Sequence, residues 1–394
     1  MSDIYEESLQ LHATNHGKIE TKLKVKCENA KDLALAYSPG VAAPCIKINE
    51  DSNLSYTYTN RSNTIAVISD CTAVLGLGKL SAEAGMPVME GKAFLFKKFA
   101  DIDAIPLVLN TTDPDEIINT CKILEKSFGG INLEDISAPN CVKIERELIN
   151  SLDIPVFHDD QHGTAIVVLS GLINALKIID KKASDCRVIV SGTGAAGSNV
   201  IKTIHNYGFT NIVAFDKDGC LYQHDKNNYD FLKQELLEYV NKDDVTYNNL
   251  KEAMVNADIF IGMSAPNLVS KEMVASMNNK AVVFALANPT PEISYDDAKD
   301  AGAYIIATGR SDYPNQVNNL LAFPYIFKGA LEAKATKITD KDKIAAALAI
   351  SSLITDQEVN NEYIIPSPFD ERLKTVVVDA VKNSCIDGGY VRHE

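Results

Sequence analysis

The stretch Cys186-Arg-Val-Ile-Val-Ser-Gly-Thr-Gly-Ala-Ala-Gly197 decides the fold. Apolar, β-branched residues dominate its first half, which predicts a buried strand. Gly192, Gly194 and Gly197 then follow with G-x-G-x-x-G spacing, and we expect a helix from Val200 to Tyr207. A strand, a glycine loop and a helix in this order predict a Rossmann unit that binds a dinucleotide.

Each glycine of this loop has a separate physical role. Gly192 allows a tight turn, Gly194 lets the backbone approach a pyrophosphate, and Gly197 lets the helix pack closely on the strand. The amide groups at the start of the helix would face the phosphates. The candidate cofactor-binding residues of the loop are Gly192, Thr193, Gly194, Ala195, Ala196 and Gly197.

The second strand of the unit carries the residue that would meet the ribose. This strand is expected over Asn211 to Phe215 and ends in Asp216, at the distance typical of a ribose-binding acid. Asp216 favours a free 2′-hydroxyl and therefore NAD. Lys217 follows directly and could instead meet a 2′-phosphate, so the sequence leaves NAD and NADP open.

Further strands continue this sheet towards the C-terminus. Ala257 to Ile261, Ala281 to Ala287 and Tyr304 to Thr308 read as buried strands, and mostly helical sequence follows. Asn288 ends the second of these strands, and Asn319 follows the third. Such asparagines can cap turns, or their amide groups can hold a substrate carboxylate.

Two pairs of acids end two strands in the first half of the chain. Ile131 to Leu133 is followed by Glu134 and Asp135, and Ile154 to Phe157 by Asp159 and Asp160 after one histidine. A helix is expected between the two strands, so they form a βαβ unit whose strand ends share one sheet edge. Four carboxylates at one edge predict a hard divalent cation, Mg²⁺ or Mn²⁺.

Two other interpretations of these acids stay open. A helix is expected to begin near Gly163 and Thr164, and a helix N-terminus tolerates acids because of its dipole. His158 and His162 are four residues apart and could suggest zinc. Their spacing straddles a turn and no cysteine flanks them, which disfavours that metal.

One lysine and one tyrosine are candidate proton carriers. Lys92 is expected at the start of a helix over Ala93 to Phe99, where the positive helix end would lower the pKa of its amine, as a base requires. A solvated surface lysine is the alternative. Tyr37 precedes Ser-Pro-Gly, a turn that could hold the phenol in one pose, or it is a half-buried structural residue.

Composition excludes several classes of protein. The 394 residues carry a net charge of −15, which disfavours binding to nucleic acid or to anionic membranes. The first residues lack the apolar segment of a secretory signal. Eight cysteines without C-x-x-C spacing fit a reducing compartment, so we expect the cytoplasm.

These patterns predict an α/β protein in two parts. Residues 1–157 would form an N-terminal α/β domain for substrate, metal and dimerisation, and residues 158–394 a Rossmann-type, doubly wound parallel sheet with C-terminal helices. Val74-Leu-Gly-Leu-Gly-Lys79 lacks the third glycine of a phosphate loop, so we interpret it as a glycine-rich connection without a nucleotide.

Several motifs together resemble malic enzyme in its short microbial form. They occur in the order of that family across nearly the whole chain: Tyr37-Ser-Pro-Gly-Val-Ala, Gly91-Lys92, Asn132-Leu-Glu-Asp135, Phe157-His-Asp-Asp-Gln-His-Gly-Thr-Ala165, the glycine loop, Ala287-Asn-Pro-Thr290 and Asn318-Asn319. The resemblance implies oxidative decarboxylation of L-malate to pyruvate and CO₂ with NAD or NADP, dependence on Mg²⁺ or Mn²⁺, and a homodimer.

The resemblance also implies roles for individual residues. Lys92 would be the base, Tyr37 the acid and Asp159 a support for the lysine. The implied metal ligands are Glu134, Asp135 and Asp160, and the residues that would meet the substrate are Asn288, also near the cofactor, and Asn319. Two alternatives are malolactic decarboxylation of malate to lactate and a metal-independent dehydrogenase of the amino-acid type.

Overall fold

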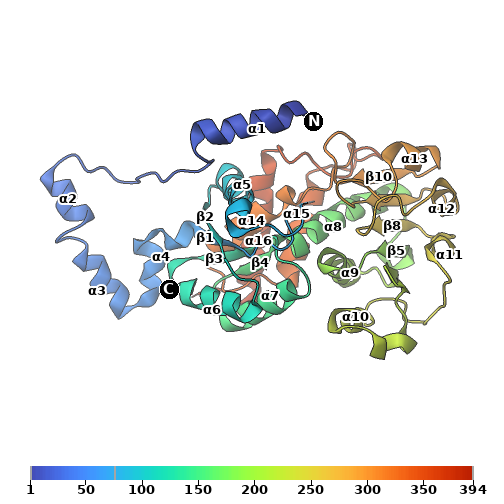
Figure 1. The fold of residues 1–394 in the computed structure, drawn as a ribbon, viewed down its shortest axis with the longest axis horizontal. Coiled ribbons are helices and arrows are strands. Elements are labelled where there is room, and N and C mark those ends of the chain that lie inside the picture. Colours follow the sequence, from blue (N-terminus) through green and yellow to red (C-terminus); the bar gives the residue numbers. More distant parts are fainter. Residues whose placement is uncertain (1, 75–76, 393–394) are drawn as a thin grey trace.

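The computed structural model describes residues 2–74 and 77–392 and contains two sheets, whose strands are parallel except for one antiparallel edge strand (Figure 1). One sheet has four strands in the order β2-β1-β3-β4, and the other has six in the order β10-β9-β8-β5-β6-β7. Helices pack between and around them. The predicted α/β class with a Rossmann-type sheet is confirmed. Leu75 and Gly76 of the glycine-rich connection lie outside the described residues.

The first sheet is built from strands that are parallel throughout. Its strands are β1 (Thr64–Ser69), β2 (Asp103–Val108), β3 (Gly130–Leu133) and β4 (Val156–His158). Its crossover helices are α5 (Ala82–Ala100), α6 (Pro114–Leu124) and α7 (Asn140–Ser151). Every residue of β1, β3 and β4 is buried, which explains why these strands are continuous apolar runs rather than alternating patterns.

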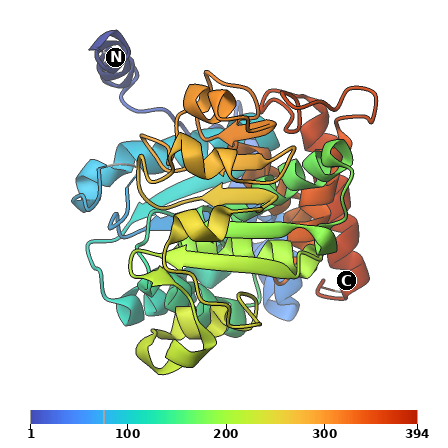
Figure 2. The same ribbon diagram turned by 90° about the vertical axis from the view of Figure 1, so that its right-hand side faces the viewer.

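The second sheet is the predicted Rossmann unit, and Figure 2 shows its strands side by side. Its strands are β5 (Arg187–Ser191), β6 (Asn211–Asp216), β7 (Gly219–Cys220), β8 (Ile259–Gly262), β9 (Val282–Ala285) and β10 (Ile305–Thr308). The chain leaves β5 for β6 on one side and later returns to β8 on the other. This change of direction opens a crevice at the carboxyl ends of β5 and β8, where such sheets bind ligands.

Short helices flank the second sheet, and single turns of 3₁₀ helix punctuate the chain. The helices are α9 (Ala195–Tyr207), α10 (Phe231–Leu236), α11 (Leu250–Met254), α12 (Lys271–Ala275) and α13 (Tyr295–Asp300). The 3₁₀ segments are η1 (Ser52–Leu54), η2 (Asn60–Asn63), η3 (Glu125–Ser127), η4 (Ala183–Asp185), η5 (Gln223–Asn228) and η6 (Asn319–Leu321).

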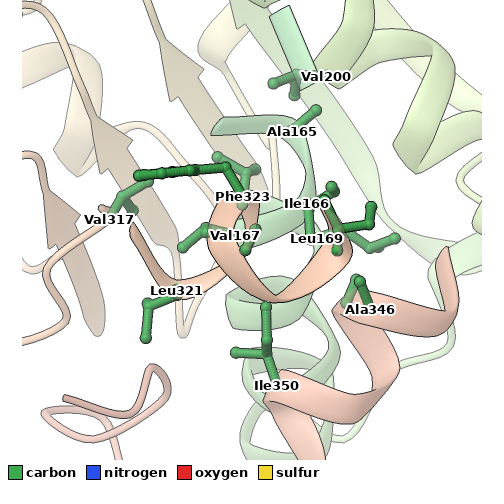
Figure 3. Close-up of a cluster of buried hydrophobic side chains, with 14 of the residues drawn as sticks. Ala165, Ile166, Val167, Leu169, Val200, Val317, Leu321, Phe323, Ala346 and Ile350 are labelled. Carbon is green, nitrogen blue, oxygen red and sulfur yellow. The ribbon is translucent and has the colours of Figure 1, made fainter. Parts of the chain in front are cut away.

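Helix α8 (Asp159–Ile179) forms the centre of the core. Figure 3 shows Ile166, Val167 and Leu169 of α8 packed against Phe323 and Ile350 from the C-terminal part of the chain. Within the described residues, α8 is also the helix long and apolar enough to cross a membrane, but 83% of its apolar window is buried inside the fold. It is therefore a core helix.

The start of α8 differs from the expectation. The helix begins at Asp159 and not near Gly163, so Asp159 and Asp160 both lie in its first turn. The helix dipole therefore stabilises these acids, as the alternative interpretation of the sequence proposed. Because α8 follows β4 without a loop, the two carboxylates are held rigidly at the strand end.

The C-terminal helices contact both halves of the molecule. These helices are α14 (Phe323–Glu332), α15 (Asp340–Ser352) and α16 (Arg372–Gly388). The ring of Phe323 lies 4.9 Å from that of Phe96 on α5, and Phe327 lies 5.5 Å from the same ring. Helix α15 packs on α8 and α9. One apolar core thus spans both sheets, and the domain boundary at residues 157 and 158 remains a prediction.

The N-terminal segment forms an arm that extends from the body (Figure 1). Its helices are α1 (Ser2–Asn15), α2 (Ala30–Ala36), α3 (Ala42–Glu50) and α4 (Ser55–Tyr58), and α2, α3 and α4 contain no buried residue. Lys18 attaches the arm to α5: its backbone amide donates to Glu90 Oε2 at 3.0 Å, and its Nζ donates to the Pro87 carbonyl at 2.6 Å.

Candidate active site

The two predicted acid pairs meet at one edge of the first sheet. Glu134 and Asp135 follow β3, and Asp159 and Asp160 follow β4. These strands are parallel neighbours with Leu133 opposite His158, so the pairs stand at the same level. The backbone amide of Asp135 donates to Asp160 Oδ2 at 3.0 Å and joins the two strand ends directly. The predicted βαβ unit is confirmed.

Three of the four acids form a cluster suited to a cation. One carboxylate oxygen from each of Glu134, Asp135 and Asp160 lies within 4.8 Å of the others. Glu134 and Asp135 are buried, and Asp135 Oδ2 has no hydrogen-bond partner among the described residues. Three carboxylate oxygens at this separation, with the buried Asp135 Oδ2 lacking a partner, fit a hard divalent ion, which prefers oxygen ligands.

Lys92 lies beside this cluster and holds the fourth acid. Its Nζ is 2.7 Å from Asp159 Oδ2 and 2.7 Å from Glu134 Oε1, and it lies 4.1 Å from the centre of the Phe323 ring. The side-chain amide of Asn319, at the start of η6, also donates to Asp159 Oδ2. The predicted residues Lys92, Asp159 and Asn319 therefore come together in one buried group.

The expected position of Lys92 in its helix was wrong. Lys92 lies in the middle of α5, which begins at Ala82 after the capping Ser81, so no helix end lowers its pKa. Burial lowers the pKa of the amine, but the charges of Asp159 and Glu134 outweigh burial and raise it above its ordinary value. These charges favour the ammonium form of Lys92.

The pKa values of the neighbouring carboxyl groups are shifted as well. Burial, together with the neighbouring acids, raises the pKa of Glu134 and of Asp159 above the ordinary range, although Lys92 opposes the shift. Burial and Asp160 raise the pKa of Asp135 to about 7. Taking these groups out of water with too little positive charge nearby is unfavourable, and a divalent cation would remove that cost.

Several polar residues that the sequence did not single out support the cluster. Asn132, inside β3, donates to Glu134 Oε2 at 2.9 Å. Glu145 of α7 accepts the backbone amide of His158 at 2.9 Å and also bonds the His162 ring at 2.9 Å. His162 is thus tied to a carboxylate, and among the described residues the cluster that could hold a metal ion consists of three acids. In the sequence, each of these residues is a polar side chain on an otherwise apolar face, and that pattern is the signal that could have identified it.

The glycine loop has the predicted geometry. Gly192 has φ of +111°, and a Cβ there would lie 2.5 Å from the Met263 carbonyl oxygen. A Cβ on Gly197 would lie 2.0 Å from the Gly192 carbonyl oxygen, so α9 packs as closely as expected. A Cβ on Gly194 would meet nothing within 4 Å, which leaves the backbone open to a ligand. Helix α9 begins directly after it, at Ala195.

A groove of about 470 Å³ runs over this loop. The predicted cofactor residues that line it are Gly192, Thr193, Gly194, Asp216 and Lys217, together with Lys233, Met263 and Ser264. Lys233 of α10 forms an ion pair with Asp216. This pair joins a strand end to a helix residue 17 positions later, and no pattern in the sequence indicated it.

Two predicted residues stand apart from the buried group. Tyr37 is the residue that directly follows α2 on the arm, and it is 70% exposed. Asn288 is exposed after β9, where its amide lies next to Gly309. Among the contacts of the described residues, none joins either side chain to Lys92 or to the acids. Their roles remain predictions.

Removing one acid of the cluster tests the cation site. Asp160→Asn should weaken Mn²⁺ binding by at least roughly 100-fold, because a ligand charge is lost. The measurement is the rise in melting temperature on adding Mn²⁺, which should disappear in the variant, while titration with dinucleotide should give the wild-type affinity. Asp258→Asn, at the buried carboxylate that pairs with Lys181, is the matched control and should keep the Mn²⁺ response. A full Mn²⁺ response in Asp160→Asn would contradict the assignment.

Helix α10, which contributes Lys233 to the groove, gives a pH-dependent prediction. Glu235 of α10 receives two hydrogen bonds of 2.6 Å from Arg146 and one of 2.9 Å from Lys202, and these bonds lower its pKa from 4.5 to about 2. The folded pKa is depressed, so the stabilisation is present above pH 4.5 and is lost as the pH falls through about 2. Glu235→Gln should therefore lower the melting temperature at pH 7. The difference in melting temperature from the wild type should shrink as the pH falls from 4.5 to about 2. A difference that grew on acidification would contradict the prediction.

Comparison with known proteins agrees with this geometry. The family model for the malic enzyme N-terminal domain matches residues 16–149, and the model for the malic enzyme NAD-binding domain matches residues 161–382. The first match contains Lys92, Glu134 and Asp135, the second contains the glycine loop, and Asp160 lies in the short gap between the two.

Individual relatives cover nearly the whole chain. The bifunctional malic/malolactic enzyme of Bacillus subtilis is 52% identical over 387 residues, which is 98% of this chain and 94% of the relative. The NAD-dependent malic enzyme of Geobacillus stearothermophilus is 48% identical and covers 95% of this chain and 77% of the relative. A crystal structure of malic enzyme from Pyrococcus horikoshii superposes with a TM-score of 0.94 at 42% identity, covering 99% of this chain and 92% of that one. The chain belongs to the malic enzyme family.

Proposed function

We propose that the protein catalyses the oxidative decarboxylation of L-malate to pyruvate and CO₂ with reduction of NAD or NADP. The observation that carries the proposal is the buried Lys92, held by Asp159 and Glu134 beside three clustered carboxylates, in a chain of this family. A dehydrogenase of the amino-acid type would leave the cluster of acids without a purpose, so we do not favour that alternative.

Different residues of this chain would bind the cation, the dinucleotide and the substrate. Glu134, Asp135 and Asp160 would hold the divalent cation, and the glycine loop would hold the dinucleotide. The cation supplies Lewis acidity towards the substrate oxygens, and the nicotinamide accepts a hydride. Asn319 and Asn288 present amide groups that can orient a substrate carboxylate.

Lys92 would remove the proton from the C2 hydroxyl of malate as the hydride leaves C2. The C3–C4 bond of the resulting keto acid then breaks, CO₂ leaves, and C3 takes a proton from Tyr37. Lys92 must be neutral to act as a base. Burial favours the neutral amine, whereas Asp159, Glu134 and Asp160 raise its pKa. A cation held by Glu134 and Asp160 would offset their charges and so shift the amine towards its neutral form. Asp159, fixed by Asn319, keeps Nζ in position.

The arm supports a homodimer. It exposes a row of apolar side chains: Leu9, Leu23, Val25, Leu33, Leu35, Tyr37, Val41 and Ile46. A protein rarely leaves so much apolar surface in water, and a second copy of the chain is the occupant that could cover both arms by symmetry. Tyr37 lies on this arm, away from Lys92 of its own chain. We therefore propose that each arm delivers Tyr37 to the site of the partner.

A second candidate activity is malolactic conversion, with lactate as the product. The Bacillus subtilis relative at 52% identity carries both activities in its name. The same site would support it if pyruvate stayed bound and took the hydride back from the reduced cofactor.

The eight cysteines are all free, and six of them are buried, which supports a cytoplasmic location.

The activity has a direct assay. Purified protein with L-malate and Mn²⁺ should form reduced nicotinamide and pyruvate in equal amounts, with NAD and NADP tested in parallel. Removing the metal with a chelator should abolish turnover, and adding Mn²⁺ back should restore it. Lactate formed without net reduction of the cofactor would show the malolactic reaction instead. No malate turnover with either cofactor would refute the proposal.

Mixing two inactive variants tests the exchange of Tyr37. Tyr37→Phe and Lys92→Ala should each lose most activity. If Tyr37 acts across the dimer, half of the randomly mixed dimers regain one intact site, so unfolding and refolding the two together should restore about a quarter of wild-type activity. Refolding each variant alone is the control. A mixture as inactive as its components would place Tyr37 and Lys92 of one chain in the same site.

A further inference from the structure

Glu292 is a buried acid outside the residues discussed so far. It follows β9 by a short loop and is 0% exposed. Its Oε1 accepts the backbone amide of Ser264 at 2.8 Å, and its Oε2 accepts the backbone amide of Ala287 at 3.1 Å. One carboxylate thus binds the loop after β8 and the loop after β9 at the same time.

The backbone around Glu292 is shaped to receive this side chain. A Cβ on Gly262 would lie 2.4 Å from Cδ of Glu292, so only glycine leaves room for the carboxyl group at the end of β8. Backbone bonds reinforce the junction: the amide of Val269 donates to the Glu292 carbonyl at 3.0 Å, and that of Asn267 donates to the Pro291 carbonyl at 3.0 Å. The Glu292 side chain therefore occupies the space that Gly262 leaves open.

The two loops that Glu292 joins belong to different parts of the site. Ser264 lines the dinucleotide groove, and its hydroxyl lies 2.9 Å from that of Ser191 at the end of β5, next to the glycine loop. Ala287 directly precedes Asn288, the predicted substrate residue. The carboxylate therefore fixes the distance between the wall of the cofactor groove and the amide that would orient the substrate.

We propose that Glu292 is a positioning residue that sets the relative placement of cofactor and substrate, an inference that rests on the proposed function. A carboxylate suits this task because it offers two acceptor oxygens and no donor. A glutamine of the same shape turns one end into an N–H donor facing an N–H donor. One buried backbone amide then loses its partner, and that loop shifts.

The test compares Glu292→Gln with a matched variant elsewhere. Asp342→Asn serves as the control, because Asp342 is also buried, at 1% exposed, and accepts bonds from the Thr339 amide, the Thr339 hydroxyl and the Ser384 hydroxyl, away from both loops. Both variants should lower the melting temperature. Only Glu292→Gln should also weaken NADH binding, measured by fluorescence titration, and raise KM for malate, each by roughly tenfold.

The conservative variant Glu292→Asp goes through the same measurements, so the test survives if Glu292→Gln does not fold. Aspartate keeps both acceptors but is shorter, and it should give a smaller rise in both constants than glutamine. NADH binding needs no malate turnover, so the titration reports on Glu292 even if the proposed reaction is wrong. Wild-type NADH affinity and wild-type KM in a folded Glu292 variant, with only the melting temperature lowered, would overturn the proposal.

Discussion

The buried ammonium group of Lys92 between the carboxylates of Glu134 and Asp159 is the contact on which the rest of the site depends. The three residues come from α5, the end of β3 and the start of α8, so one ionic group ties one strand end and two helices together. Removing one partner of such a group leaves an uncompensated buried charge, which is strongly unfavourable. The same group that would carry the proton transfer therefore also fixes the architecture around it.

Helix α8 carries this constraint to the other half of the molecule. Its first turn supplies Asp159 and Asp160, and its length packs against α9, which begins at the glycine loop. The side-chain amide of Asn199 on α9 donates to Gln161 on α8 at 3.1 Å. The acid cluster and the dinucleotide loop are therefore attached to neighbouring, rigid helices, and their separation does not depend on a flexible linker.

The charges of the site are not balanced within the chain. Four acids surround one lysine, and burial together with the charge of Asp160 raises the pKa of Asp135 to about 7, although Lys92 opposes the shift. Stability alone would favour fewer acids here. Their presence is explained if the site binds a cation, and the stability that they cost the protein is then a consequence of that function. Glu292, by contrast, has each carboxylate oxygen bonded to a backbone amide of a different loop.

The sequence by itself determined the second sheet, the glycine loop, Asp216 and the two acidic strand ends. These features follow from local patterns: apolar runs of strand length, glycines at fixed spacing, and acids at the point where a run stops. A parallel βαβ unit then places both acidic ends on one edge without further information. This placement follows from the direction of the two strands and from the handedness of the helical connection between them.

Only the tertiary structure decided which charges meet. Lys92 and Asp159 are 67 residues apart and Asp159 and Asn319 160 apart, and no local pattern records such pairs. The sequence placed Lys92 at a helix start and expected a lowered pKa, whereas its buried partners raise it. The ion pair of Lys233 with Asp216 and the junction at Glu292 were invisible for the same reason. A side chain's charge state and its partners depend on what the folded chain brings within a few ångströms, and sequence distance does not measure that.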